Sequence, residues 1–150
     1  MTQVTADTAA EFFTAVSEAS NKADWAAVAN VVGDEPRVRM VHPTWEGETL
    51  WFATSTDSAK AQQLRENPNI DVQFQVSPPE FVHIMARGKV EFPTDAETRQ
   101  RVWDLLTYDL ADFWPNGVDD PDYIPVKIVC SRVELSEMFG TMNKRVWRPA

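Results

Sequence analysis

The 150-residue chain is poor in cysteine and histidine, and each shortage argues against a class of protein. The single cysteine, Cys130, cannot form an internal disulfide, and its apolar, strand-like surroundings favour a buried and unreactive thiol. With two histidines, His42 and His83, and no cluster of cysteine and histidine, we expect no dedicated zinc site.

Glycine is also scarce, and its five positions form none of the common glycine-rich signatures. The sequence has no G-x-G-x-x-G, no G-x-x-x-x-G-K-[ST] and no G-x-S-x-G. These absences argue against a Rossmann fold, a P-loop and the nucleophile elbow of hydrolases.

Basic side chains are outnumbered, with 14 Lys and Arg against 23 Asp and Glu, for a net charge of -9. Such a charge argues against general binding of nucleic acid or of an anionic membrane, although a single pocket can still be locally positive. No apolar run approaches the ~20 residues that span a bilayer. The first residues also lack the basic and apolar segments of a secretory signal. We therefore expect a cytoplasmic protein.

Hydrophobic periodicity predicts three helices and six strands in one domain, residues 1–150. Capping boxes, Thr8-Ala-Ala-Glu11 and Thr94-Asp-Ala-Glu97, mark the starts of the first and third helices. We expect these helices to run over about 9–20 and to about Asp112, and a short helix to lie between a polar turn at 55–57 and Pro68. Strands are predicted over 25–32, 37–42, 50–54, 71–76, 81–92 and 123–138.

Short turns at 33–36 and 46–48 predict that the first three strands form an antiparallel meander. Gly88, inside the fifth strand, indicates a bend or bulge. The pattern as a whole predicts a mainly β (α+β) fold, a closed or partly closed antiparallel barrel with helices outside. The basic and aromatic residues 141–150 form either an edge strand or a partner-binding arm.

The polar turn after the third strand is the first candidate site. Thr54, Ser55, Ser58 and Lys60 bring three hydroxyls and an ammonium to the start of a helix, where free N–H groups and the helix dipole attract anions. Asp57 would repel an anion and is more simply the N-cap. The alternative interpretation is an ordinary capped helix with a solvated lysine.

The preceding strand adds two arginines on one face, Arg37 and Arg39. If Arg39 points toward the polar turn, it completes a clamp for an anion; otherwise it is solvated or paired with a surface carboxylate. Of the six tryptophans, five are considered for the site, and one or two of these are expected to line a planar ligand while the rest lie in the core or at an interface: Trp45, Trp51, Trp103, Trp114 and Trp147. His83 and Gln73 are candidate donors to a ligand ring, against a solvated or dimer-buried role.

These residues together resemble a known family. LWFATSTDSAKAQQLRENPNIDVQF, residues 50–74, resembles the strand, T-x-x-D-S-x-K, helix and N-P segment of pyridoxamine 5'-phosphate oxidase-like flavin-binding split barrels. Arg39-Met-Val41 is similar to the R-x-V strand before it, and 84–88 to a strand that ends in glycine. Residues 113–122 resemble the W-P-x-G-x-x-D-P loop of the bacterial general stress protein branch. The resemblance covers about Thr8 to Met138.

The resemblance implies a six-stranded antiparallel split β-barrel that forms a homodimer and binds FMN at the dimer interface. It assigns the phosphate to Arg39 and Lys60, with hydrogen bonds from Thr54 and Ser58. The ribityl chain and ring would meet Met40, Val41, Phe52 and Ala53, and His83 would approach the flavin from the other subunit.

The sequence departs from the family pattern at two places. Ala59 stands where the true oxidases carry a second cation, which predicts a weaker grip on phosphate. The basic C-terminal pattern that grips pyridoxal phosphate is absent, so vitamin B6 oxidation is not expected.

We therefore expect an FMN-binding protein of the general stress type, an oxidoreductase with an unknown small-molecule substrate and unassigned catalytic residues. The alternatives are a non-catalytic module that binds a flavin, deazaflavin or tetrapyrrole, and a cofactor-free interaction protein.

Overall fold

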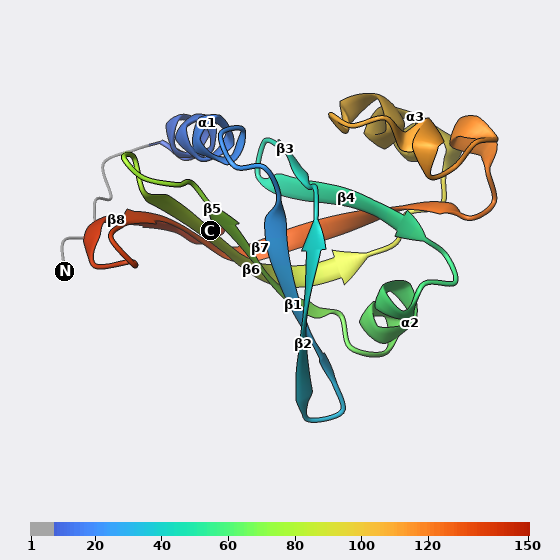
Figure 1. The fold of residues 1–150 in the computed structure, drawn as a ribbon, viewed down its shortest axis with the longest axis horizontal. Helices are drawn as coiled ribbons and strands as arrows, with labels where there is room; N and C mark the ends of the chain where they lie inside the picture. Colours follow the sequence, from blue (N-terminus) through green and yellow to red (C-terminus); the bar gives the residue numbers. More distant parts are fainter. Residues whose placement is uncertain (1–7) are drawn as a thin grey trace.

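One antiparallel sheet of eight strands dominates the computed structural model, which describes residues 8–150 (Figure 1). The strands are β1 (Ala26–Val32), β2 (Glu35–Val41), β3 (Thr44–Glu46), β4 (Thr49–Ser55), β5 (Asn69–Gln75), β6 (Val82–Glu91), β7 (Tyr123–Glu137) and β8 (Met142–Trp147). The helices are α1 (Ala9–Ser20), α2 (Ala59–Glu66) and α3 (Ala96–Leu105), followed by the short 3-10 helices η1 (Leu110–Asp112) and η2 (Gly117–Asp119). This arrangement confirms the mainly β class with helices on the outside.

The strand order is β2-β1-β5-β6-β7-β4-β3, with β8 also pairing with β7. The count of eight corrects the expectation of six, because the three-residue β3 escaped notice and the tail pairs as an edge strand, β8. The predicted meander of the first three strands is confirmed for the hairpin of β1 and β2 and wrong for the third strand, β4. β2 pairs with β1, whereas β4 pairs with β7 and β3, so β2 and β4 belong to opposite ends of the sheet.

The long strand β7 connects the two halves of the sheet. It pairs with β6 along one edge, and along the other with β4 over Tyr123–Val129 and with β8 from Val133 onward. The register between β6 and β7 shifts after Arg87, where Gly88 lies opposite Cys130, which confirms the predicted bulge. Cys130 is buried, and this burial raises the pKa of its thiol to about 12.

Helix α1 closes one side of the barrel with its aromatic face. As predicted, Thr8 caps the helix by accepting a hydrogen bond from the amide of Glu11. The Phe13 ring packs 4.9 Å from Trp147 of β8 and 5.6 Å from Trp45 of β3, measured between ring centres. The helix therefore holds the sheet's last strand and its third strand against one core.

Strand β4 is buried on both faces, which explains its nearly continuous apolar sequence. Leu50 and Phe52 face the main core, whereas Trp51 and Ala53 pack under α3 and the segment that follows it. Helix α3 is capped by Asp95 rather than Thr94 and ends at Leu105, well before Asp112, because Leu106 is extended (ψ 139°). Trp51 and Ala53 belong to a second hydrophobic cluster, separate from the main core. The apolar residues beyond α3, on η1 and the adjoining turns, pack into this same cluster.

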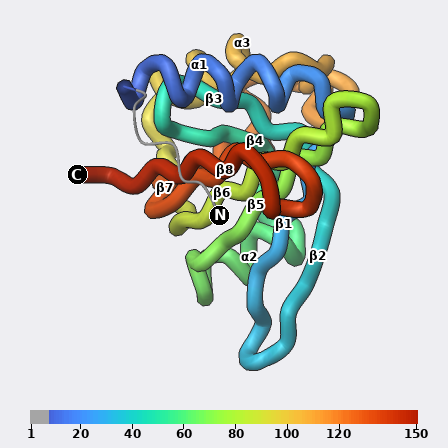
Figure 2. The backbone as a smooth tube through the Cα atoms, turned by 90° about the vertical axis from the view of Figure 1, so that its left-hand side faces the viewer, coloured from blue at the N-terminus to red at the C-terminus, as the bar shows by residue number. Residues whose placement is uncertain are grey.

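The β1–β2 hairpin extends away from the rest of the sheet, and both views show its turn at the bottom (Figures 1 and 2). Within residues 8–150, no helix has the length and apolar character needed to cross a membrane.

A substitution at Gly88 tests whether the bulge between β6 and β7 requires glycine. A Cβ atom at this position would lie 2.2 Å from the backbone oxygen of Val129, so the two strands must separate. We expect Gly88→Ala to reduce the free energy of unfolding by about 2–3 kcal/mol, measured by urea denaturation.

Gly33→Ala is the comparison variant, because a Cβ there meets nothing within 4 Å and only the positive φ of 62° opposes it. Its expected cost is about 1 kcal/mol. Equal costs at the two glycines would show that strand contact is not what constrains Gly88.

Candidate functional site

The seam between the two ends of the sheet forms a cleft of about 560 Å³. Strand β2 and the residue after it contribute Met40, Val41 and His42, and β4 contributes Ala53 and Thr54 across the gap. These two strands are not hydrogen-bonded to each other, and their side chains line the two sides of the cleft. The cleft thus lies where the barrel is split.

One cationic side chain lines this cleft, and a second lies near enough for its charge to act on the first. Lys60, on the first turn of α2, lines the cleft and places its ammonium 5.7 Å from the centre of the Phe52 ring. Burial, followed by the positive charge of Arg39 on β2, lowers the pKa of Lys60. Among the ion pairs of residues 8–150, none joins Arg39 or Lys60 to a carboxylate. A bound anion would relieve this repulsion.

The Thr54 and Ser58 hydroxyls of the polar turn lie beside Lys60, but Ser58 already caps the start of α2. Ser58, and not Asp57 as expected, is the N-cap, and its hydroxyl accepts a hydrogen bond from the amide of Ala61. The buried Thr54 hydroxyl lies 3.0 Å from the Ser58 hydroxyl. Ala59 is exposed on the first turn, where it provides no charge.

An aromatic wall, made of Trp25, Tyr108, Phe113 and Trp114, faces the rest of the cleft. Tyr108, Phe113 and Trp114 contact one another edge-on or tilted, with ring centres 5.8 Å apart at each step. Trp25 and Phe113 are 57% and 65% exposed, so their apolar surfaces are available to a planar ligand.

Arg99 of α3 holds the loop behind this wall in place. Its guanidinium donates to the backbone oxygens of Tyr123, Val118 and Asp120 at 2.7 Å, 3.0 Å and 3.0 Å. The Trp114 indole then donates to the Ser55 hydroxyl at 3.3 Å, which ties the wall to the end of β4.

The structure brings most of the predicted site residues together. Five of the nine line the cleft, namely Met40, Val41, Ala53, Thr54 and Lys60, and Arg39 lies beside them. The Phe52 side chain faces the core and contacts the cleft only through Lys60, while Ser58 serves as the helix cap.

His83 does not reach the cleft within the chain. It is buried on β6, where its Nε2 atom accepts a hydrogen bond from the backbone N–H of Phe139 at 2.8 Å. Its Nδ1 atom lies 2.8 Å from the Gln75 side-chain oxygen and therefore carries the proton of a neutral ring. A contact of His83 with a flavin of the other subunit stays a prediction.

The sequence reasoning missed Trp25, His42, Tyr108 and Phe113 as lining residues, whereas Trp114 was among the tryptophans considered. The one available signal was the W-P-x-G-x-x-D-P loop, because it directly follows Phe113. His42 lies exposed at the edge of the cleft, with its Nε2 atom 3.1 Å from the Thr107 hydroxyl.

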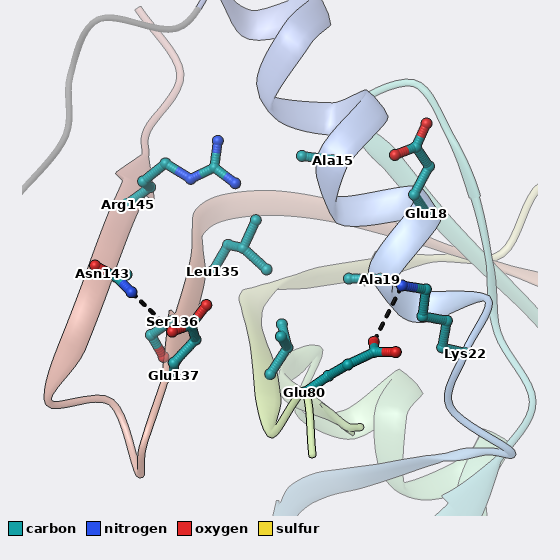
Figure 3. A pocket seen from close by; sticks show the side chains of 11 residues that line it. Ala15, Glu18, Ala19, Lys22, Glu80, Leu135, Ser136, Glu137, Asn143 and Arg145 are labelled. Carbon is teal, nitrogen blue, oxygen red and sulfur yellow. Dashed lines mark hydrogen bonds and ion pairs between the residues drawn. The ribbon is translucent and has the colours of Figure 1, made fainter. Parts of the chain in front are cut away.

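A second cleft, of about 420 Å³, lies between α1 and the β7–β8 hairpin (Figure 3). The Lys22 ammonium lies 3.0 Å from Glu80, and the Asn143 amide donates to Glu137 at 2.7 Å. Three acidic residues line this cleft against two basic ones. An anionic ligand is therefore better placed at the seam, beside Lys60.

The fold and the cleft define a split-barrel protein, a mainly β class in which the barrel opens at a seam. Residues 13–136 match the family model described as pyridoxamine 5'-phosphate oxidase, and the chain belongs to this family. It is also 24% identical to General stress protein 26 of Bacillus subtilis over 104 residues, which cover 68% of this chain and 71% of that protein.

Solved structures share the fold at low identity. General stress protein 26 from Bacillus anthracis superposes with a TM-score of 0.74 at 17% identity, covering 92% of this chain and 98% of that one. A pyridoxamine 5'-phosphate oxidase-related, FMN-binding protein from Nostoc punctiforme has a TM-score of 0.64 at 19% identity, covering 91% and 90%. A haem-binding protein from Mycobacterium smegmatis has a TM-score of 0.68 at 17% identity, covering 94% and 59%.

The lowered pKa of Lys60 makes stability depend on pH. Between the lowered value and the ordinary 10.5, the unfolded chain binds more protons at Lys60 than the folded chain does, so the free energy of unfolding rises with pH. We expect Lys60→Met to raise the melting temperature of the ligand-free protein at neutral pH, and the gain to shrink as the pH approaches 10.5.

Melting temperatures of both proteins across this pH range measure the effect. Lys89→Met, which removes an exposed cation from β6, controls for the change in net charge. A Lys60→Met variant that melts lower than the wild type at neutral pH would contradict the proposed strain.

Proposed function

We propose that the protein binds FMN in the seam cleft and acts in the cytoplasm as a flavin-dependent oxidoreductase of the general stress type. The observation that carries this proposal is that the charge of Arg39 acts on the Lys60 ammonium, while no ion pair of residues 8–150 joins either side chain to a carboxylate. A phosphate monoester supplies the two negative charges that such a pair lacks.

The cleft also suits the rest of the FMN molecule. Arg39 and Lys60 would hold the phosphate, with the Thr54 hydroxyl as a further hydrogen-bonding group. The apolar side chains of Met40, Val41 and Ala53 and the aromatic wall would exclude water from the ribityl chain and ring. A bound flavin supplies hydride chemistry, whereas the protein supplies binding, orientation and charge.

Haem is the second candidate ligand, because His42 lies at the edge of the same cleft and imidazole ligates haem iron. Arg39 and Lys60 would then meet the haem carboxylates. The absorbance spectrum of the purified protein distinguishes the candidates, since a flavin and a haem have unmistakably different visible bands.

The phosphate clamp predicts a preference for FMN over riboflavin, which lacks the phosphate. We expect Arg39→Ala or Lys60→Ala to weaken FMN binding by about 10–150-fold, the effect of losing about 1.5–3 kcal/mol in a charged hydrogen bond. Riboflavin affinity should change little. Titration calorimetry of the wild type and both variants with both flavins measures the six affinities.

Arg37→Ala provides the matched control. Arg37 lies on the same strand and the same face as Arg39, but its guanidinium is 3.7 Å from the Glu35 carboxylate. This variant should bind FMN as the wild type does. Wild-type affinities that are equal for FMN and riboflavin would rule out the phosphate clamp.

Oxidoreductase activity is tested separately from binding. Under anaerobic conditions, NADH or NADPH should bleach the bound FMN if the protein transfers hydride. Retained FMN that neither nucleotide bleaches would instead support the non-catalytic binding module.

We also propose that the protein is a homodimer. Exposed apolar side chains gather on β6, β8 and the turn between β7 and β8, including Met85, Phe139 and Met142, of which Phe139 is 81% exposed. Light scattering should give twice the chain mass of 17.0 kDa. A measured mass of one chain would contradict the dimer.

A further inference from the structure

A short relay of two side-chain amides, of which Asn30 is buried and Gln63 half-buried, connects Arg39 to β1 and α2. The Arg39 guanidinium donates to the side-chain oxygen of Asn30 on β1 at 2.9 Å. The Asn30 amide nitrogen in turn donates to the side-chain oxygen of Gln63 on α2 at 3.1 Å. Asn30, at the centre of the relay, is 2% exposed.

The polarity of the relay is set at Arg39, because a guanidinium can only donate hydrogen bonds. The Asn30 oxygen must therefore face Arg39, its nitrogen must face Gln63, and the Gln63 oxygen must face Asn30. The relay joins β2, β1 and α2, the last of which also carries Lys60.

Three other arginines of the described chain contact a carboxylate where Arg39 contacts a neutral amide. Arg87, Arg101 and Arg132 each lie within 3.4 Å of a carboxylate oxygen, which cancels much of their charge. An aspartate at position 30 would do the same to Arg39 without any change in side-chain size. The neutral amide instead fixes the guanidinium and leaves its positive charge available.

We propose that Asn30 and Gln63 are positioning residues that hold Arg39 in place and leave its positive charge unpaired, and thereby make the cleft select a phosphate monoester over an uncharged analogue. This inference rests on the proposed function, since it concerns the anion that Arg39 and Lys60 would hold.

Asn30→Asp is the decisive variant. Its carboxylate would pair with Arg39, and the Gln63 amide can rotate to donate to the remaining oxygen. We expect FMN affinity to fall by about tenfold or more, as removal of a charged partner would, while riboflavin affinity stays unchanged. Inorganic phosphate should raise the melting temperature of the wild type and raise that of Asn30→Asp much less.

Asn30→Ala separates charge from shape. It leaves Arg39 charged but unsupported, so its FMN affinity should fall between those of the wild type and Asn30→Asp. A merely structural role for Asn30 predicts equal losses for FMN and riboflavin, and a larger loss for alanine than for the same-sized aspartate. Gln100→Glu, an exposed amide-to-acid change on α3, should alter neither affinity.

The outcomes distinguish this inference from the function on which it rests. A wild type that responds to neither FMN nor phosphate overturns both. A wild type that prefers FMN, together with an Asn30→Asp variant that keeps the preference, overturns only the role of Asn30. If Asn30→Asp does not fold, the ratio of FMN to riboflavin affinity in Asn30→Ala decides, and an unchanged ratio overturns the inference.

Discussion

The split of the sheet depends on strand β7, because each backbone edge of a strand can pair with one neighbour at a time. One edge of β7 follows β6, while the other pairs first with β4 and then with β8. The change of partner separates β4 from β8 and directs β4 toward β2 across the core. The seam where β2 and β4 face each other without hydrogen bonds is consequently the place where the barrel has room for a ligand.

The cations at the seam are not paired with carboxylates, unlike several cations on the protein surface. The protein is acidic overall, and most arginine contacts with acidic groups lie at the surface, where they contribute little to stability. Arg39 and Lys60 instead repel each other beside an apolar wall. The repulsion between the two cations lowers the free energy of unfolding. An anion that binds only to the folded state raises it again.

The features that could be predicted from the sequence were those encoded locally. Thr8 and Glu11 marked the start of α1, and the alternation of β5 and the glycine of β6 placed those strands. Partner choice is not local, so β4 was wrongly paired with β2. The third helix was extended too far because its apolar spacing continues beyond Leu105, although the backbone turns at Leu106.

Some residues of the candidate site could be predicted from the sequence, and others are brought together only by the fold. The resemblance pointed to Arg39 and Lys60, whose nearness in the fold agrees with a shared role. Asn30 and Gln63 escaped notice because a single amide in an apolar strand and another on a polar helix carry no joint pattern. Only the fold brings them to one arginine. Trp25 and Phe113 were missed for the same reason.

The burial of Cys130 has a consequence for handling the protein in air. Because burial raises the pKa of the Cys130 thiol to about 12, the thiol form dominates and the reactive thiolate is scarce at pH 7. Peroxide attacks the thiolate first, so sulfenic acid should form far more slowly here than at an exposed cysteine. Prolonged storage without a reducing agent should leave the chain free of cross-links, and any dimer observed afterwards is held together by non-covalent contacts.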